Sequence, residues 1–451
     1  MKSPEKPKPT SDAATEAQAD RGSQESFRVT APSLSLHKGG GAIRGMGEKF
    51  AANPVTGTGS MSVPIATSPG RSGFAPQLAL SYDSGAGNGP FGFGWTLSLP
   101  SITRKTDKGL PQYNDKAESD VFILSGAEDL VPVLMQTGDG HWVPEVIPDR
   151  TVDNKTYNIR RYRPRIEGLF VRIERWSHHT DPTDVFWRSI TKDNITTWYG
   201  KTDESRMVDP ADTSRIFSWL ICESHDDKGN AIVYEYKKED SDGINTAQAH
   251  ERNRTSTSRS ANRYLKRIQY GNRAPYFPVL SPTAGPALQP SEWLFEVVLD
   301  YGEHDLEKPP PDDSVQPWPV RLDPFSIYRA GFEVRTYRLC QRVLMFHHFA
   351  GELQAQDYLV RSTDFTYSHE ENPTDTSNSI FSFLQSATHS SYRLQSDDTY
   401  LKRSLPPLAF EYTKPIVNEK MQEADAESLQ NLPYGFDGSA YQWVDLDGEG
   451  L

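Results

Sequence analysis

Hydrophobic and polar residues alternate along much of this chain with a period of two, the pattern of a β-strand with one buried face. Between 295 and 301, Phe295, Val297, Leu299 and Tyr301 share one face. Similar alternation recurs in 78–82, 171–174, 334–349, 361–369 and 407–412. The aromatic content of 11% also favours strands over helices. The pattern predicts an all-β protein whose strands each keep one face in water.

A β-hairpin is predicted at 187–200. Asp193 and Asn194 tolerate a positive φ angle and have β-branched residues on both sides, which is typical of a tight turn between two strands. Ile190 and Trp198 are then expected to help cover the core.

Two further segments, DDKGNAIVYEYKKE (226–239) and RYLKRIQYGNR (263–273), resemble the YD or rearrangement-hotspot (RHS) repeats. Each places apolar side chains on one strand face: Ile232, Tyr234 and Tyr236 in the first, Tyr264, Ile268 and Tyr270 in the second. A single hairpin cannot bury its own apolar face, so consecutive units of this kind stack into a continuous sheet. We therefore expect a long, curved antiparallel sheet.

The stretch 45–106 combines glycines, prolines and aromatic residues and leaves little room for a helix. Five glycines permit tight turns that can fold three aromatic side chains inward: Gly85, Gly87, Gly89, Gly92 and Gly94, with Phe91, Phe93 and Trp95. The order matches neither GxxxxGK[ST] nor GxGxxG at the start of a helix, and Pro90 interrupts it. An architectural role is favoured over a phosphate cradle.

This stretch and two others carry a family resemblance. They read GMGEKFAANPVTGTGSMSVPIATSPGRSGFAPQLALSYDSGAGNGPFGFGWTLSLPSITRKTDKGLPQY, then SDVFILSGAEDLVPV (119–133) and YQWVDLDGEGL (441–451). From about residue 41 onward, the chain resembles the N-terminal domain shared by the Salmonella virulence plasmid B protein (SpvB) family and the TcaC/TcdB-like B component of insecticidal toxin complexes.

The resemblance implies a fold and a role. In that family the B and C components enclose a toxic effector, and an adjoining β-propeller docks on the pore-forming A component. It implies a non-catalytic structural component that contributes to an RHS/YD-like β-shell, with the C and A components as partners. One alternative is the delivery or secretion region of an SpvB-like ADP-ribosylating toxin without its catalytic domain. Another is a calcium-dependent adhesion or carbohydrate-binding module.

Composition shifts predict four regions. Residues 1–40 are polar and proline-rich and are expected to form a disordered leader, followed by the β domain at 41–413. Residues 414–440 are predicted to be a linker, and 441–451 resemble the start of a truncated VCBS/FG-GAP propeller repeat. Within the β domain, 240–262 is predicted to be a mobile surface loop. The proline-dense stretches 273–292 and 307–324 are predicted to be extended connections.

Charge and hydropathy limit the classes of molecule that this chain is expected to bind. Lys plus Arg number 48 against 61 Asp plus Glu, and this net charge of −13 disfavours nucleic acid and anionic lipid. No apolar run of membrane-spanning length and no apolar signal-peptide core is found. We expect cytoplasmic synthesis followed by extracellular release through a nonclassical or lysis-linked route. Cys222 and Cys340 are expected to be two free core cysteines, although one disulfide stays open.

No catalytic, cofactor-binding or metal-ligating residue is assigned. Asp445, Asp447 and Glu449 have the spacing of a calcium loop, but a turn that begins a propeller blade is favoured. The adjacent pairs His178-His179 and His347-His348 point to opposite strand faces and so rarely share one ion. No HExxH, CxxC or GxSxG motif appears.

Two other sets of charged residues are interpreted as surface residues or ion pairs rather than as functional sites. The carboxylate pairs Glu118/Asp120 and Glu303/Asp305 have acid–base potential but are expected to be solvated surface residues. The basic cluster around Tyr162 is expected to pair with acidic neighbours on adjoining strands rather than bind an anion; it comprises Arg160, Arg161, Arg163 and Arg165.

Overall fold

The computed structural model describes residues 49–52, 58–125, 128–152, 154–166, 170–278, 292–311, 316–353, 355–371, 381–397 and 399–413. The chain divides into two compact units, Met1–Glu411 and Tyr412–Leu451. The fold below is that of the first unit. The predicted leader (1–40), linker (414–440) and propeller start (441–451), including Asp445, Asp447 and Glu449, lie outside the described residues.

Part of the main sheet closes into a barrel, in which successive strands pair antiparallel and the last pairs with the first. Its eight strands, in order around the ring, are β7 (Ser101–Arg104), β8 (Phe122–Leu124), β9 (Glu128–Pro132), β13 (Lys155–Pro164), β14 (Arg172–His178), β15 (Val185–Ile190), β16 (Thr196–Tyr199) and β18 (Asp212–His225). Closure leaves these strands without a free edge, which protects them from pairing with other chains.

Aromatic side chains fill the barrel core. The ring centroids of Trp187 lie 5.0 Å from those of Phe122, 4.9 Å from Tyr162 and 5.9 Å from Trp219. All four side chains are at most 5% exposed. Tilted and edge-to-face contacts of this kind contribute about 0.5–1.5 kcal/mol each beyond the area that they bury.

The other face of the barrel strands is also covered. Trp176, Phe186 and Trp198 pack together there in a second apolar cluster with Tyr157, Ile159 and Cys222. The expectation of a water-exposed face is therefore wrong in this region, because Glu174 on that face is fully buried and accepts hydrogen bonds from Arg188 and Trp176. A buried carboxylate is tolerated when its oxygens have such partners.

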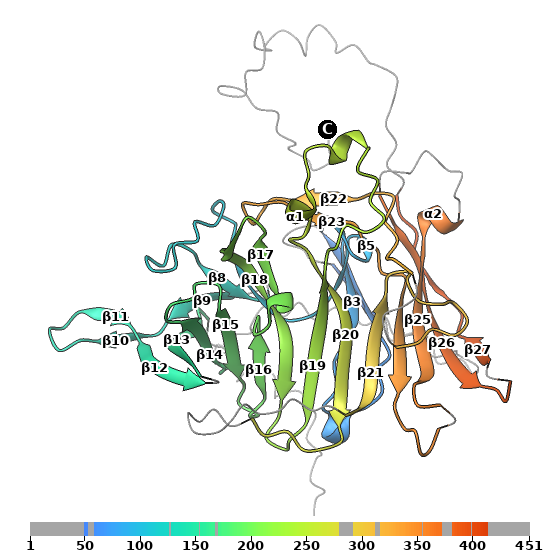
Figure 1. The fold of residues 1–451 in the computed structure, drawn as a ribbon, viewed down its shortest axis with the longest axis horizontal. Helices are drawn as coiled ribbons and strands as arrows, with labels where there is room; N and C mark the ends of the chain where they lie inside the picture. Colours follow the sequence, from blue (N-terminus) through green and yellow to red (C-terminus); the bar gives the residue numbers. More distant parts are fainter. Residues whose placement is uncertain are drawn as a thin grey trace, which may run out of the picture. The chain divides into compact units, whose positions relative to one another are not determined.

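Beyond β18 the sheet continues as an open, antiparallel wall (Figure 1, green to orange). Its strands are β19 (Ala231–Lys238), β20 (Arg263–Asn272), β21 (Trp293–Asp300), β24 (Arg342–His347), β25 (Tyr358–Tyr367) and β26 (Leu384–Leu394), and β26 also pairs with β27 (Tyr400–Ser404) and β28 (Leu408–Ala409). The all-β prediction is confirmed. The apolar residues predicted on 226–239 and 263–273 meet across the β19–β20 register, Ile232 opposite Tyr270 and Tyr234 opposite Ile268.

The glycine-rich segment forms a layer on this wall. Its four-stranded sheet consists of β1 (Lys49–Ala52), β2 (Gly59–Pro64), β3 (Ala79–Asp83) and β6 (Trp95–Leu97), and a short hairpin joins β4 (Asn88–Gly89) to β5 (Gly92–Phe93). The backbone of this hairpin bonds to the wall, from Cys340 N to Pro90 O and from Phe93 N to Ser382 O, both at 2.9 Å. As predicted, Phe91 and Trp95 are buried; Phe93 is only partly so.

The smaller elements surround these sheets. They are β10 (Leu134–Gln136), β11 (Trp142–Pro144), β12 (Val146–Val152), β17 (Arg206–Asp209), β22 (Phe325–Ile327), β23 (Val334–Thr336), the short helices α1 (Ser256–Arg259) and α2 (Ser368–Glu371), and the 3₁₀ turns η1 (Arg71–Gly73), η2 (Asp203–Ser205) and η3 (Ala249–Glu251). No helix among the described residues is long and apolar enough to cross a membrane.

The predicted hairpin at 187–200 is confirmed, with β15 and β16 paired and Asn194 at φ 56°. Trp198 is buried there, whereas Ile190 is only partly covered. The expectation of a surface loop at 240–262 is wrong in part. Glu251 is 2% exposed and accepts hydrogen bonds from Arg259, Arg335 and Tyr337, so this polar segment is held by buried ion pairs rather than by apolar burial.

Candidate functional site

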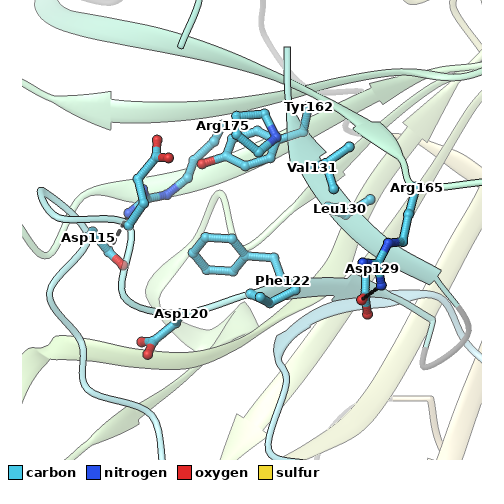
Figure 2. A pocket seen from close by; sticks show the side chains of 12 residues that line it. Asp115, Asp120, Phe122, Asp129, Leu130, Val131, Tyr162, Arg165 and Arg175 are labelled. Atoms are coloured by element: carbon cyan, nitrogen blue, oxygen red, sulfur yellow. Dashed lines mark hydrogen bonds and ion pairs between the residues drawn. The ribbon is translucent and has the colours of Figure 1, made fainter. Parts of the chain in front are cut away.

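A cavity of about 190 Å³ lies beside the aromatic barrel core. Its lining comes from the β7–β8 loop, β8, β9, β13 and β14, and includes Asp115, Phe122, Tyr162 and Arg175 (Figure 2). The site therefore joins one long loop to four neighbouring strands of the barrel.

Asp115 holds two buried guanidinium groups together. The Nη1 and Nη2 atoms of Arg104 lie 2.6 and 2.9 Å from its carboxylate oxygens, and Nη2 of Arg175 bonds to the same carboxylate. Asp120 accepts a further hydrogen bond from Arg104 Nη1 at 2.7 Å. Arg104 and Arg175 also lie over the ring of Phe122, at 5.1 and 5.3 Å from its centroid. The cluster fastens the β7–β8 loop to the barrel.

The electrostatics of this cluster keep Asp115 ionised. Burial by itself raises the pKa of a carboxyl, but the hydrogen bonds from Arg104 and the charges of Arg175 and Arg104 outweigh it, so the pKa of Asp115 is lowered. A carboxylate held as an anion by two arginines does not serve as a general acid, and a base that already accepts several charged hydrogen bonds is a poor proton acceptor. The arrangement suits structural fastening.

Sequence reasoning missed Arg104, Asp115 and Arg175. One signal was present: Arg175 follows Ile173 on the same strand face, so a charge stands at a position where alternation expects an apolar side chain. The partner Asp115 could not be found in this way, because it lies 60 residues away in a loop.

The prediction that the carboxylate pairs Glu118/Asp120 and Glu303/Asp305 are solvated holds for one residue of each pair. Glu118 and Asp305 are exposed, as expected. Asp120 and Glu303 are not solvated, since their side chains are 5% and 1% exposed and pair with Arg104 and Lys266. The tertiary fold supplies these cations from distant segments, and local sequence spacing carries no trace of them.

One buried trio has the donor types of a metal site. Asp300, Glu303 and His304 bring their ligand atoms within 4.8 Å of one another. Lys266 Nζ, however, lies 2.5 Å from Glu303 and 2.7 Å from His304 Nε2, and Arg342 bonds to Asp300. Protein cations neutralise the carboxylates in the place where a metal ion would bind.

The histidines and cysteines lie where local roles account for them. His178 and His179 sit at the end of β14, while His347 bonds to Ser68 and His348 lies between Glu296 and Asp357. Cys222 and Cys340 are free and buried, as predicted. Burial raises the pKa of Cys222 to about 11, which keeps its thiol protonated and unreactive at neutral pH.

Three arginines of the basic cluster around Tyr162 pair with acidic residues as predicted, but only one partner, Asp129 on β9, lies on an adjoining strand. Arg160 bonds to Glu118, Arg161 to Glu145 and Arg165 to Asp129. These are partly exposed pairs, which contribute little stability individually.

An apolar ribbon, defined here as β10, β11 and the start of β12, projects beside the barrel (Figure 1, turquoise). Leu134 and Met135 point to opposite faces of β10, as do Trp142 and Val143 on β11. Six large apolar side chains of the ribbon are 36–63% exposed: Leu134, Met135, Trp142, Val143, Val146 and Ile147. Apolar exposure on both faces of a two-stranded ribbon is typical of a surface that another protein covers.

The closed barrel and the open antiparallel wall together define an all-β domain. The family model for the Salmonella virulence plasmid 65kDa B protein, SpvB, matches residues 53–349, and this chain belongs to that family.

Curated relatives support the assignment. The mono(ADP-ribosyl)transferase SpvB of Salmonella choleraesuis (strain SC-B67) is 40% identical over 352 residues, which cover 76% of this chain and 55% of the relative. The SpvB of Salmonella dublin is 40% identical over 345 residues. The chain thus matches about half the length of these relatives.

Solved structures agree on the fold. The N-terminal domain of the effector protein SpvB from Salmonella typhimurium strain LT2 has a TM-score of 0.63 and 39% identity, and the match covers 74% of this chain and 98% of that domain. TcdB2-TccC3 has a TM-score of 0.68 and 33% identity, covering 85% of this chain and 17% of the other. The Photorhabdus luminescens Tc holotoxin pore has a TM-score of 0.67 and 33% identity, and the match covers 86% of this chain and 17% of the other. The resemblance to SpvB and toxin-complex components expected from the sequence is confirmed.

Proposed function

We propose that this chain is a non-catalytic structural component of an insecticidal-type toxin complex and contributes to a β-shell that encloses a toxic effector. The observation that carries the proposal is the apolar ribbon, because it offers apolar side chains on both faces for burial in an assembly. The similarity to TcdB2-TccC3, in which two components occur together, supports a toxin-complex C component as the partner that covers the ribbon.

The arrangement of charged groups supports a non-catalytic role. In the barrel cavity the carboxylates of Asp115 and Asp120 are engaged by arginine, and the trio around Glu303 is engaged by Lys266 and Arg342. By the same resemblance we propose docking to a pore-forming A component. We also propose cytoplasmic synthesis followed by extracellular release through a nonclassical or lysis-linked route.

Size-exclusion chromatography with the C component from the same organism tests the proposal. We expect a stable complex with the wild-type chain and at least tenfold weaker association with Leu134→Ser/Trp142→Ser, because apolar anchors dominate interfaces. Leu306→Ser is the matched control, since Leu306 is also exposed, at 80%, but lies outside the ribbon. Failure of the wild-type chain to bind the C component contradicts the proposal.

A second candidate is the delivery or secretion region of an SpvB-like ADP-ribosylating toxin. It is favoured by the match over 98% of the SpvB N-terminal domain at 39% identity. This candidate predicts that the chain carries a fused reporter protein into the medium and does not bind the C component. The two measurements together separate the candidates.

A further inference from the structure

Buried arginine side chains in the described part of the chain have carboxylate partners. The side chains of nine of them are at most 13% exposed and each has an Asp or Glu within 4.0 Å: Arg104, Arg175, Arg188, Arg206, Arg259, Arg321, Arg335, Arg338 and Arg342. This is the expected arrangement, because a guanidinium group stays charged and is costly to bury without a counter-charge.

Arg263 is partly buried and differs from these arginines. It begins β20, and its Nη1 donates to the carbonyl oxygens of Ser260, Ala261 and Asn262 at 2.9, 3.1 and 3.0 Å. Within the described residues no carboxylate lies within ion-pair distance of it, and its buried Nε has no acceptor. The Nε and Nη2 edge of the fork, the edge suited to bidentate contact with an oxyanion, is thus left without a protein acceptor there.

Arg263 lines a second cavity, of about 370 Å³. Lys238 at the end of β19 and Arg206 at the start of β17 line the same cavity, with Asp203 and Glu204 as its acidic residues. Asp203 is already bonded to Arg206. Three cations against two carboxylates leave a local excess of positive charge in a chain whose net charge is −13.

The environment of Arg263 is energetically unfavourable for its charge. Burial lowers the pKa of its guanidinium to about 10, and the nearby charges of Glu204 and Asp203 only partly oppose this. An incoming anion that accepts hydrogen bonds from Arg263 relieves this cost, because it supplies both the missing acceptor and the counter-charge.

We propose that this cavity is an oxyanion-binding site, in which Arg263 holds a carboxylate or phosphate group through the free edge of its guanidinium and Lys238 adds a second positive charge. The site lies where β17, β19 and β20 meet, next to the strand that connects the barrel to the open wall. A bound anion therefore links these two parts of the domain. This inference is independent of the proposed function.

Isothermal titration calorimetry of the full chain at constant ionic strength tests the proposal, with inorganic phosphate and acetate as separate probes. We expect one-site binding of at least one probe, and the stronger probe identifies a tetrahedral or a planar oxyanion. Arg263→Lys keeps the charge but loses the fork, so its affinity is expected to fall about tenfold. Lys238→Gln is expected to weaken binding severalfold.

Arg403→Gln is the matched control, because Arg403 is an exposed arginine on β27, outside the cavity. Its affinity should equal that of the wild type. The proposal is overturned if neither probe binds the wild-type chain at concentrations of about 10 mM, a weak limit on the affinity scale. Equal affinities of the wild type and Arg263→Lys, or an equal loss in Arg403→Gln, also overturn it. If Arg263→Lys does not fold, Lys238→Gln replaces it as the test, and an affinity of Lys238→Gln equal to that of the wild type overturns the proposal.

Discussion

Ser68 Oγ lies 2.7 Å from Nε2 of His347, although 279 residues separate them in the chain. A serine so close to a histidine has the first two members of a nucleophilic triad. Ser68 is only 7% exposed, however, and lines neither of the two cavities described above, while its carbonyl accepts a hydrogen bond from Tyr270 at 2.6 Å. The pair therefore fastens the glycine-rich layer to the open wall.

Ser68→Ala should destabilise the domain by about 1–2 kcal/mol, because it leaves the half-buried His347 without this partner. Urea unfolding followed by tryptophan fluorescence measures the change. Ser81→Ala is the control, since the hydroxyl of the partly exposed Ser81 bonds to the exposed Ser98, and the Ser81 carbonyl that accepts from Thr96 Oγ1 is kept in the variant. Equal effects of the two substitutions would show that the Ser68 contact does not stabilise the domain.

His348 should make stability pH-dependent. Burial disfavours its charged form, but Glu296 and Asp357, each 2.8 Å from a ring nitrogen, outweigh burial and raise its pKa above the usual 6.5. The folded state then binds the proton more tightly than the unfolded state. The stabilisation is fully present below about pH 6.5 and is lost as pH rises through the raised pKa.

His348→Gln should therefore cost more stability at about pH 5.5 than at about pH 8.5 in urea unfolding. His347→Gln is a control with the opposite pH dependence. Burial, together with the charges of Arg361 and His348, lowers the pKa of His347 in the folded state. The unfolded state therefore binds this proton more tightly, and wild-type His347 destabilises the fold as pH falls. A cost of His348→Gln that does not change with pH would contradict the charge assignment.

Asp115→Asn should destabilise the barrel by about 2–4 kcal/mol, because Arg104 and Arg175 remain buried while the carboxylate that they share is lost. Thermal unfolding measures the loss. Glu118→Gln, in the partly exposed pair with Arg160, is the control and should cost less than about 1 kcal/mol. The structural role of the cluster is rejected if both variants melt alike.

Gly92→Ala should cost about 1–3 kcal/mol or more. Gly92 has φ 91°, and a Cβ atom there would lie 2.6 Å from the carbonyl oxygen of Ser382, so the hairpin would have to leave the wall. Gly138→Ala is the control, because nothing lies within 4 Å of its added Cβ. Calorimetric unfolding compares the two, and an unchanged melting temperature for Gly92→Ala would contradict the close packing.

The sequence by itself determined the strands, because a period of two depends only on neighbouring residues. The alternation at 295–301, the Asn194 turn and the inward Phe91 and Trp95 could all be predicted in this way. The resemblance of the glycine-rich segment to known sequences likewise identified the family.

Only the tertiary structure decided which strand faces are exposed to solvent and which charged side chains are buried. Glu174 and Asp120 have the local pattern of surface residues, yet the fold covers them and supplies arginines from other strands. The closure of the barrel through β9–β13 and β7–β18, and the lack of an acceptor for Nε of Arg263, depend in the same way on contacts between distant segments. Such contacts lower the free energy only once the chain has been brought together, so no local pattern records them.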